Sequence, residues 1–335
     1  MSSQKLNPIF YDYIWLDANG LLRSKHRILY EEDGYKITDK IPEWNYDGSS
    51  TGQASINGNT EIILKPVYIH KIPEKYYNRV LCDVFDIDGK PLSNRQKAIE
   101  YFSKQDVIQE DPWFGLEQEF YLIPKDEENS VFSQLENKNE YCFVNRNGIE
   151  RQIMTELRLQ CLSYSIKITG FNAEVAPHQW EFQLLGKGVQ ICDQLYMVRY
   201  MLEGIAEKYS YKVIYSPKPH QSVSGSGCHV NFSTNASRSK DTGYEVIEEY
   251  IQRFEKNHMK LIECCSKENK ERLSGKCETA KWDTFSWGVG TRNTSIRVPN
   301  EVFKNKCGYL EDRRPGADID PYLYLTTMCQ IALDN

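Results

Sequence analysis

The stretch Trp113-Phe-Gly-Leu-Glu-Gln-Glu-Phe120 carries two glutamates, Glu117 and Glu119, in a segment that reads as a β-strand. Successive side chains of a strand point to opposite faces, so residues at i and i+2 share a face. We therefore expect both carboxylates to point into one cavity from a rigid support. Taken alone, a glutamate on a strand is more often a solvated surface residue, so the interpretation depends on further ligands elsewhere in the chain.

Four such candidates lie farther along the sequence. Glu174 and Glu181 flank Pro177, where two short strands meeting at a turn would present both side chains. His229 lies on a predicted strand after a glycine-rich turn, and Glu311 lies in a segment near the C-terminus. Carboxylates suit hard cations such as Mg²⁺ or Mn²⁺, and a single imidazole favours Mn²⁺. Several carboxylates that stay ionised together need such cations, so the set predicts a metal site for phosphoryl transfer from ATP.

Composition narrows the class of protein. The 335 residues are 40% apolar and 26% charged, which is ordinary for a globular enzyme. A net charge of −6 argues against a nucleic-acid partner, and no apolar run reaches membrane-spanning length. Ten cysteines without a C-x-x-C pair indicate free thiols in a reducing compartment, and zinc is disfavoured. No secretory signal is visible, so we expect a cytoplasmic protein with no membrane partner.

The patterns of apolar residues divide the chain into a β-rich part and a larger part with both helices and strands. This organisation predicts the α+β fold class. Alternating segments predict strands at 11–16, 21–29, 61–64 and 79–85. A 3.6-residue periodicity predicts helices at 94–108, 147–166, 189–209 and 243–265. We therefore expect a small domain at 1–90 and a second domain at 91–335.

Further motifs stand in a fixed order along the chain. They are Ile41-Pro-Glu-Trp-Asn-Tyr-Asp-Gly-Ser-Ser-Thr-Gly52, the ligand-bearing segments 113–120, 172–183, 227–234 and 308–315, Arg272-Leu-Ser-Gly275 with Glu278-Thr279, and residues 288–299. With these motifs nearly the whole chain resembles type II glutamine synthetase, the shorter, eukaryotic-type form. The resemblance implies a β-grasp N-terminal domain and a catalytic domain with a curved antiparallel sheet flanked by helices, similar to guanido kinases.

The implied reaction is the ATP-dependent ligation of ammonia to glutamate, which gives glutamine, ADP and phosphate through γ-glutamyl phosphate. By resemblance, two or three Mg²⁺ or Mn²⁺ ions would bind per site. One set of implied ligands, near glutamate and ammonia, is Glu119, Glu174 and Glu181. The other set, which would hold the ATP phosphates, is Glu117, His229 and Glu311.

The resemblance also implies roles for other residues. The implied catalytic residues are Asp47, which would bind ammonium, Glu278, which would close over the intermediate, and Arg292, which would stabilise the phosphoryl group. Those implied for glutamate are Gly225, Arg272, Arg297 and Arg313. Those implied for ATP are Trp113, Asn231, Ser233, Arg238 and Tyr309. Guanidinium groups fit carboxylates and phosphates with paired hydrogen bonds, which is why arginine suits these positions.

The resemblance further implies a homo-oligomer, either a ring of five or stacked rings forming a decamer. Its active sites would lie between subunits, and Asp47 would come from the neighbouring subunit. The expected partners are otherwise the small molecules glutamate, ammonia and ATP.

The chain departs from the family pattern at several positions. Ser224 replaces a usual asparagine, His178 stands where a small residue is usual, and Cys277 replaces a usual histidine. Two alternatives therefore stay open. One is a related glutamate–amine ligase with an altered amine or acid substrate, and the other is a non-catalytic, ring-forming relative.

Overall fold

The computed structural model describes residues 7–31, 34, 40–71, 77–126, 131–134, 139–144, 148–276 and 279–334. The chain forms two compact units. One is Met1–Gln96 with Ser163–Ser165, and the other is Lys97–Leu162 with Ile166–Asn335. None of the helices in these described ranges is long and apolar enough to cross a membrane.

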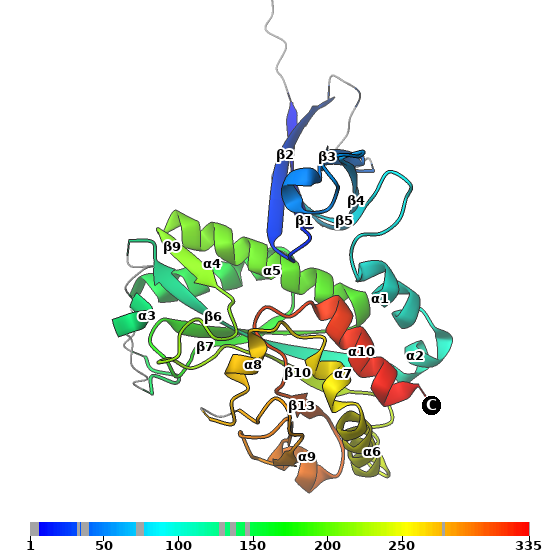
Figure 1. Cartoon of the computed structure of the whole chain (residues 1–335), viewed down its shortest axis with the longest axis vertical. Coiled ribbons are helices and arrows are strands. Elements are labelled where there is room, and N and C mark those ends of the chain that lie inside the picture. The colour runs from blue at the N-terminus through cyan, green and yellow to red at the C-terminus, as the bar shows by residue number, and fades with distance from the viewer. Residues whose placement is uncertain are drawn as a thin grey trace, which may run out of the picture. The chain divides into compact units, whose positions relative to one another are not determined.

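The N-terminal unit is built on a five-stranded sheet with the order β2-β1-β5-β4-β3 (Figure 1). Its strands are β1 (Pro8–Leu16), β2 (Leu22–Tyr30), β3 (Trp44–Asp47), β4 (Glu61–Lys71) and β5 (Tyr77–Phe85). β1 and β5 are parallel, and the other pairs are antiparallel. The strands predicted in this part of the sequence are confirmed.

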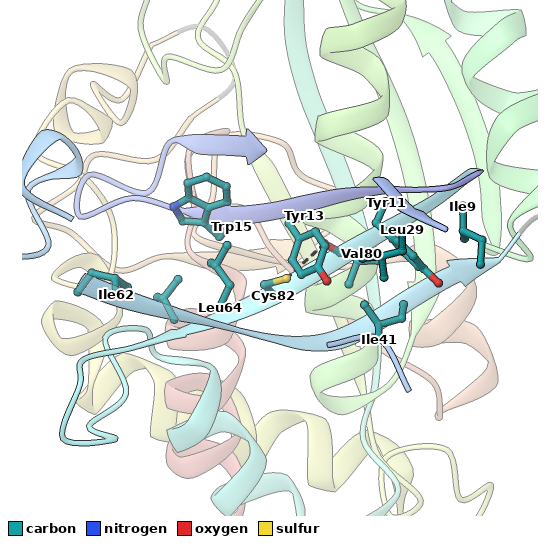
Figure 2. Packing of buried hydrophobic residues seen from close by; sticks show 11 residues of the cluster. Ile9, Tyr11, Tyr13, Trp15, Leu29, Ile41, Ile62, Leu64, Val80 and Cys82 are labelled. Atoms are coloured by element: carbon teal, nitrogen blue, oxygen red, sulfur yellow. Dashed lines mark hydrogen bonds between the residues drawn. The ribbon is translucent and has the colours of Figure 1, made fainter. Parts of the chain in front are cut away.

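One face of this sheet carries the core of the unit. Every second residue of β1, from Ile9 to Trp15, belongs to the buried cluster that Figure 2 shows. Leu64, Val80 and Cys82 from the neighbouring strands pack against them. Tyr13 keeps its hydroxyl satisfied because it donates a hydrogen bond of 2.7 Å to the Pro42 carbonyl.

The larger unit is built on a mostly antiparallel sheet with the order β11-β12-β13-β10-β6-β8-β7, and β9 pairs with β6. The strands are β6 (Trp113–Pro124), β7 (Ile168–Ala173), β8 (Gln179–Gly186), β9 (Tyr211–Ile214), β10 (Cys228–Ser233), β11 (Trp287–Val289), β12 (Ile296–Val298) and β13 (Leu310–Asp312). The long strand β6 pairs with β8 on one side and, on the other, with β10 and then with β9. It is therefore the strand around which the unit is organised.

Helices accompany this sheet (Figure 1). They are α1 (Arg95–Phe102), α2 (Gln105–Glu110), α3 (Val131–Gln134), α4 (Gly148–Ser163), α5 (Gly188–Lys208), α6 (Gly243–Lys256), α7 (His258–Ile262), α8 (Asn269–Arg272), α9 (Asn300–Asn305) and α10 (Pro321–Leu333). The helix α5 contacts β6, β8 and β9, and α10 contacts α5, α6 and α7. Because α5 and α10 are apolar on most of their surface, they form the interior of the unit.

Two helix predictions were wrong in their extent. The helix predicted at 94–108 is two helices, α1 and α2, because Lys104 is extended with ψ of 138° and the acidic Asp106 lies in the first turn of a new helix. The helix predicted at 243–265 is also two, since Asn257 leaves helical geometry between α6 and α7. Its side-chain amide donates to the Arg253 carbonyl at 3.0 Å, which ends α6.

Candidate active site

Five of the six candidate ligands lie on neighbouring strands of the larger sheet, and Glu174 directly follows a strand. In the register of the sheet, Glu119 of β6 lies opposite Glu181 of β8, and Glu117 lies opposite His229 of β10. Glu311 of β13 pairs with the residue two positions beyond His229. Side chains two residues apart on a strand share a face, so this register gathers ligands from four strands on one face.

The first group, called here the three-glutamate group, consists of Glu119, Glu174 and Glu181. One carboxylate oxygen from each lies within 4.8 Å of the others. Glu174 follows the last residue of β7, and the turn after it returns the chain into β8. The backbone N–H of Gly227 donates to Glu119 Oε2 at 2.8 Å, which fixes that carboxylate.

Burial raises the pKa values of two carboxyl groups in the three-glutamate group. Removal from water raises the pKa of Glu119 to about 8, and the negative charge of Glu174 adds to the effect. Burial also raises the pKa of Glu181 to about 9, with further contributions from the neighbouring glutamates. Carboxylates so arranged favour either protons or a cation, and the donor set of oxygens fits a hard divalent cation.

The second group, called here the histidine group, consists of Glu117, His229 and Glu311, again with one ligand atom each within 4.8 Å. His229 Nδ1 lies 3.6 Å from a carboxylate oxygen of each of the two glutamates. Burial, aided by the positive charge of Arg313, lowers the pKa of His229 well below its usual value. A neutral imidazole is the form that binds metals, so this group also fits a divalent cation.

Three of the predicted arginines lie beside these groups. Arg297 Nε is 2.8 Å from Glu311 Oε2, and Arg313 also pairs with Glu311. The buried Arg272 donates to the carbonyls of Arg313 and Arg314. Arg272 and Arg313 line a cavity of about 250 Å³ together with Glu119, Glu174, His229 and Gly225.

Gly225 is required by the close packing of this cavity wall. A Cβ atom at this position would lie 2.4 Å from Arg272 Cγ and 2.6 Å from the Pro217 carbonyl oxygen. A larger residue there would push the guanidinium group out of place. Ser224, the departure noted in the sequence, lines the same cavity. Arg292 is exposed, and its guanidinium carbon lies 5.4 Å from the centre of the Tyr141 ring.

A second cavity, of about 320 Å³, adjoins the histidine group. Four of the five residues predicted for ATP line it, together with Glu117; these are Trp113, Asn231, Ser233 and Tyr309. The fifth, Arg238, is held against the cavity wall because it donates to Ser233 Oγ at 2.9 Å. The Asn231 amide also donates to Glu117 Oε1 at 2.7 Å, so cavity and ligand group are connected.

Three residues of this region were not predicted as site residues from the sequence. Asp111 accepts hydrogen bonds from Trp113 Nε1, from Lys187 at 2.6 Å and from Arg238 at 3.1 Å, so it holds three side chains around the second cavity. It has no motif of its own, and only its position two residues before Trp113 could have drawn attention to it. Asn172 and Gln183, which donate to Glu174 and Glu181, lie inside a quoted motif but were passed over.

Two predicted catalytic residues are not part of these groups as described. Asp47 ends β3 in the N-terminal unit and is exposed. Ser49 donates to Asp47 Oδ1 from its hydroxyl at 2.6 Å and from its backbone N–H at 2.9 Å. These bonds lower the pKa of Asp47. Glu278 lies outside the described residues, as does Cys277.

An antiparallel sheet that gathers acidic groups able to hold divalent cations is the arrangement of a metal-dependent enzyme of the α+β class. Sequence comparisons identify the family within that class. The family model described as "Glutamine synthetase, catalytic domain" matches residues 88–334. The chain belongs to the glutamine synthetase family, and the resemblance predicted from the sequence is confirmed.

Full-length relatives agree with this assignment. The chain is 41% identical to a "Putative glutamine synthetase" of Acanthamoeba polyphaga mimivirus, over 98% of this chain and 96% of that protein. It is 39% identical to "Glutamine synthetase N-1" of Phaseolus vulgaris, over 99% and 96% of the two chains. It is 37% identical to "Glutamine synthetase 1, mitochondrial" of Drosophila melanogaster, over 98% and 85%. Identities of this size over nearly the whole length fit a diverged type II member.

Proposed function

We propose that the chain catalyses the ATP-dependent ligation of ammonia to glutamate through γ-glutamyl phosphate. The observation that carries this function is the contact between the two cavities. Glu119 and Glu174 of the three-glutamate group line one cavity, and Glu117 of the histidine group lines the other. His229 Nε2, which belongs to the histidine group, lies 3.9 Å from Glu119 Oε1. A glutamate in the first cavity and a nucleotide in the second would therefore meet at the ligand groups.

Both ligand groups fit Mg²⁺ or Mn²⁺ by their oxygen and imidazole donors. Such cations, two or three per site, would neutralise the phosphoryl oxygens and align donor and acceptor. Glu119, Glu174 and Glu181 would hold one ion, and Glu117, His229 and Glu311 would hold another.

The remaining residues bind and orient the substrates. Arg272 and Arg313 would bind the glutamate carboxylates beside Gly225, because a guanidinium group donates two parallel hydrogen bonds to a carboxylate. Arg297 would contact the phosphates near Glu311, and Arg292 would stabilise the phosphoryl group in transfer. The ring of Tyr309 would pack on the adenine, and Trp113, Asn231, Ser233 and Arg238 would complete the ATP pocket.

Ammonia needs a base and a compact anion. Asp47 suits that role because two hydrogen bonds from Ser49 keep its carboxylate ionised. Asp47 would come from the neighbouring subunit. Glu278 would close over the intermediate, exclude water and accept an ammonium proton.

The assembly follows the family as well. The N-terminal domain, 1–90, would be a β-grasp domain, which the central parallel pair of β1 and β5 supports. The catalytic domain would be 91–335. The chain would form a ring of five or two stacked rings, with active sites between subunits, and would act in the cytoplasm. Relatives are named both as cytosolic isozymes and as a mitochondrial enzyme.

The test is ADP release by purified protein with ATP, Mg²⁺ or Mn²⁺, glutamate and ammonia. We expect ADP only when glutamate and ammonia are both present, with glutamine accumulating in equal amount. Release that ignores ammonia would overturn the proposed reaction. Faster release with a small alkylamine would instead assign the altered-amine alternative, which the comparisons do not favour. Dilution to monomers should abolish activity, and unchanged specific activity would contradict a shared site.

A further inference from the structure

Gln183, which belongs to none of the predicted site residues, lies between the two ligand groups. It follows Glu181 by two residues on β8 and therefore shares its face, and it pairs in register with Glu117 of β6. Its Nε2 donates to Glu181 Oε1 at 2.7 Å. Gln183 also lines the 320 Å³ cavity together with Glu117 and Tyr309. One residue thus both binds a carboxylate of the three-glutamate group through its amide and forms part of the wall of the nucleotide cavity.

The neighbouring strand is shaped to receive this amide. The pairing of β7 with β8 is irregular between Ile168 and Gly170, and Gly170 pairs with Gln183. A Cβ atom at position 170 would lie 2.8 Å from Gln183 Oε1 and 3.4 Å from its Cδ. The absence of a side chain at Gly170 therefore leaves the space in which the amide sits, and β7 confines it from one side.

A neutral donor suits a carboxylate that must also bind a cation. An arginine or lysine at this place would fix Glu181 equally well, but its positive charge would compete with the cation for the same oxygens. An amide N–H orients one oxygen and leaves the full negative charge in place. Asn172 does the same for Glu174, with its Nδ2 donating to Oε1 at 3.0 Å.

We propose that Gln183 is a positioning residue that holds Glu181 in its cation-binding orientation and couples that orientation to the nucleotide cavity. A nucleotide that packs against Gln183 restricts the amide, and the amide restricts the carboxylate. Occupancy of the cavity therefore changes the affinity of the three-glutamate group for its cation. The inference rests on the proposed function, since it assumes that this group holds a divalent cation.

The test measures Mn²⁺ binding by the full chain, by electron paramagnetic resonance of free Mn²⁺, with and without ADP and with no turnover. Gln183→Met removes the donor and keeps the length of the side chain. Gly170→Ala leaves Gln183 intact but displaces its amide, and the displaced atom is the end of a flexible side chain. Gln190→Met, at an exposed position of α5, is the matched control.

We expect Gln183→Met to weaken one of the two Mn²⁺ sites by about tenfold or more, the usual effect of removing a hydrogen-bond partner from a metal ligand. Gly170→Ala should weaken the same site by a smaller factor, and Gln190→Met should leave both sites unchanged. The factor by which ADP changes Mn²⁺ affinity should shrink in the Gln183 variant, since coupling between two sites is reciprocal.

The outcomes separate this inference from the function on which it rests. Wild-type Mn²⁺ affinity in Gln183→Met overturns the positioning role and leaves the proposed ligase intact. An undiminished ADP effect in that variant overturns the coupling. A wild-type chain that binds no Mn²⁺ overturns both the inference and the metal assignment of the proposed function.

Discussion

The two ligand groups of the site use similar side chains but balance their charge in different ways. In the three-glutamate group, neutral donors bind each carboxylate; they include the Gly227 N–H and the side-chain amides of Asn172 and Gln183. In the histidine group, Glu311 pairs with the guanidinium groups of Arg297 and Arg313. The first group has no direct ion pair with an arginine among the contacts described above, so most of its negative charge is left for a cation, whereas part of the charge of the second is compensated by direct pairs.

This difference has an energetic consequence. Uncompensated buried carboxylates destabilise the folded chain until a cation or a proton neutralises them. The three-glutamate group should accordingly gain the most from metal and lose the most from high pH. The histidine group should respond less, because its imidazole is neutral and its arginines remain charged. Three experiments test this contrast, and a fourth tests the nucleotide cavity beside the histidine group; their expected effects decrease in order.

Glu119→Ala should abolish glutamine formation, with a loss of about 1000-fold or more, because a metal centre contributes several kcal/mol to stabilising phosphoryl transfer. The measurement is the rate of glutamine formation at saturating substrates. Glu249→Ala, at an exposed position of α6, is the control and should keep full activity. Full activity of Glu119→Ala would remove the three-glutamate group from the mechanism.

Glu181→Gln should stabilise the metal-free chain at alkaline pH. The pKa of Glu181 is raised from 4.5 to about 9 in the folded state. The folded state therefore gains from protonation below about pH 4.5 and loses that gain as pH rises toward 9. A neutral glutamine removes this loss, so near pH 8 the metal-free variant should be more stable than the wild type.

The measurement for this variant is urea unfolding with a chelator, at several pH values between about 6 and 9. Wild-type stability should fall across this window, and the fall should be smaller in the variant. Mg²⁺ should restore the wild type more than the variant. Equal pH dependence of the two chains would contradict the charge imbalance of the group.

Arg297→Gln should make the stability of the histidine group depend on bound metal, as we expect for the three-glutamate group. Without Arg297, Glu311 loses one of its compensating charges. Because Arg297 is 30% exposed, we expect the metal-free chain to lose about 1–2 kcal/mol, less than the cost of breaking a fully buried pair. Unfolding with and without Mg²⁺ measures this loss, and metal should recover most of it. A loss that Mg²⁺ leaves unchanged would show that Arg297 acts by packing and not by charge balance.

Asp111→Asn should have the smallest effect. Its hydrogen bonds to Trp113, Lys187 and Arg238 are near the surface, so weakening them should raise the KM for ATP about two- to fivefold, equivalent to less than about 1 kcal/mol. The KM for glutamate should stay the same, since Asp111 is on the nucleotide side. An equal change in both KM values would show that Asp111 does not act on the nucleotide cavity alone.

Much of the site could be predicted because its ligands lie in short motifs whose periodicity is informative. Glu117 and Glu119 at i and i+2 can share a face only on a strand, and β6 has them there. The family and its ligase class are confirmed by the comparisons. The metal, substrate and catalytic roles of individual residues stay predictions.

Other features could not be predicted because tertiary contacts decide them. The 3.6-residue periodicity of the sequence continues through Lys104 and Asn257. It therefore did not predict the breaks between α1 and α2 and between α6 and α7. Asp111 has a left-handed backbone with φ of 47°, and two of its three partners, Lys187 and Arg238, come from distant parts of the chain. The role of Gln183 depends on the irregular pairing of β7, which leaves no pattern in the sequence.

The alternation in β6 has a consequence for how the chain reaches its native state. Glu117 and Glu119 face the site, while Phe114, Leu116 and Phe120 are buried on the other side. If the strand paired one residue out of register, every side chain would change face, and carboxylates would enter the apolar core as the aromatic rings left it. The charges that serve the chemistry thus also penalise mispaired sheets during folding.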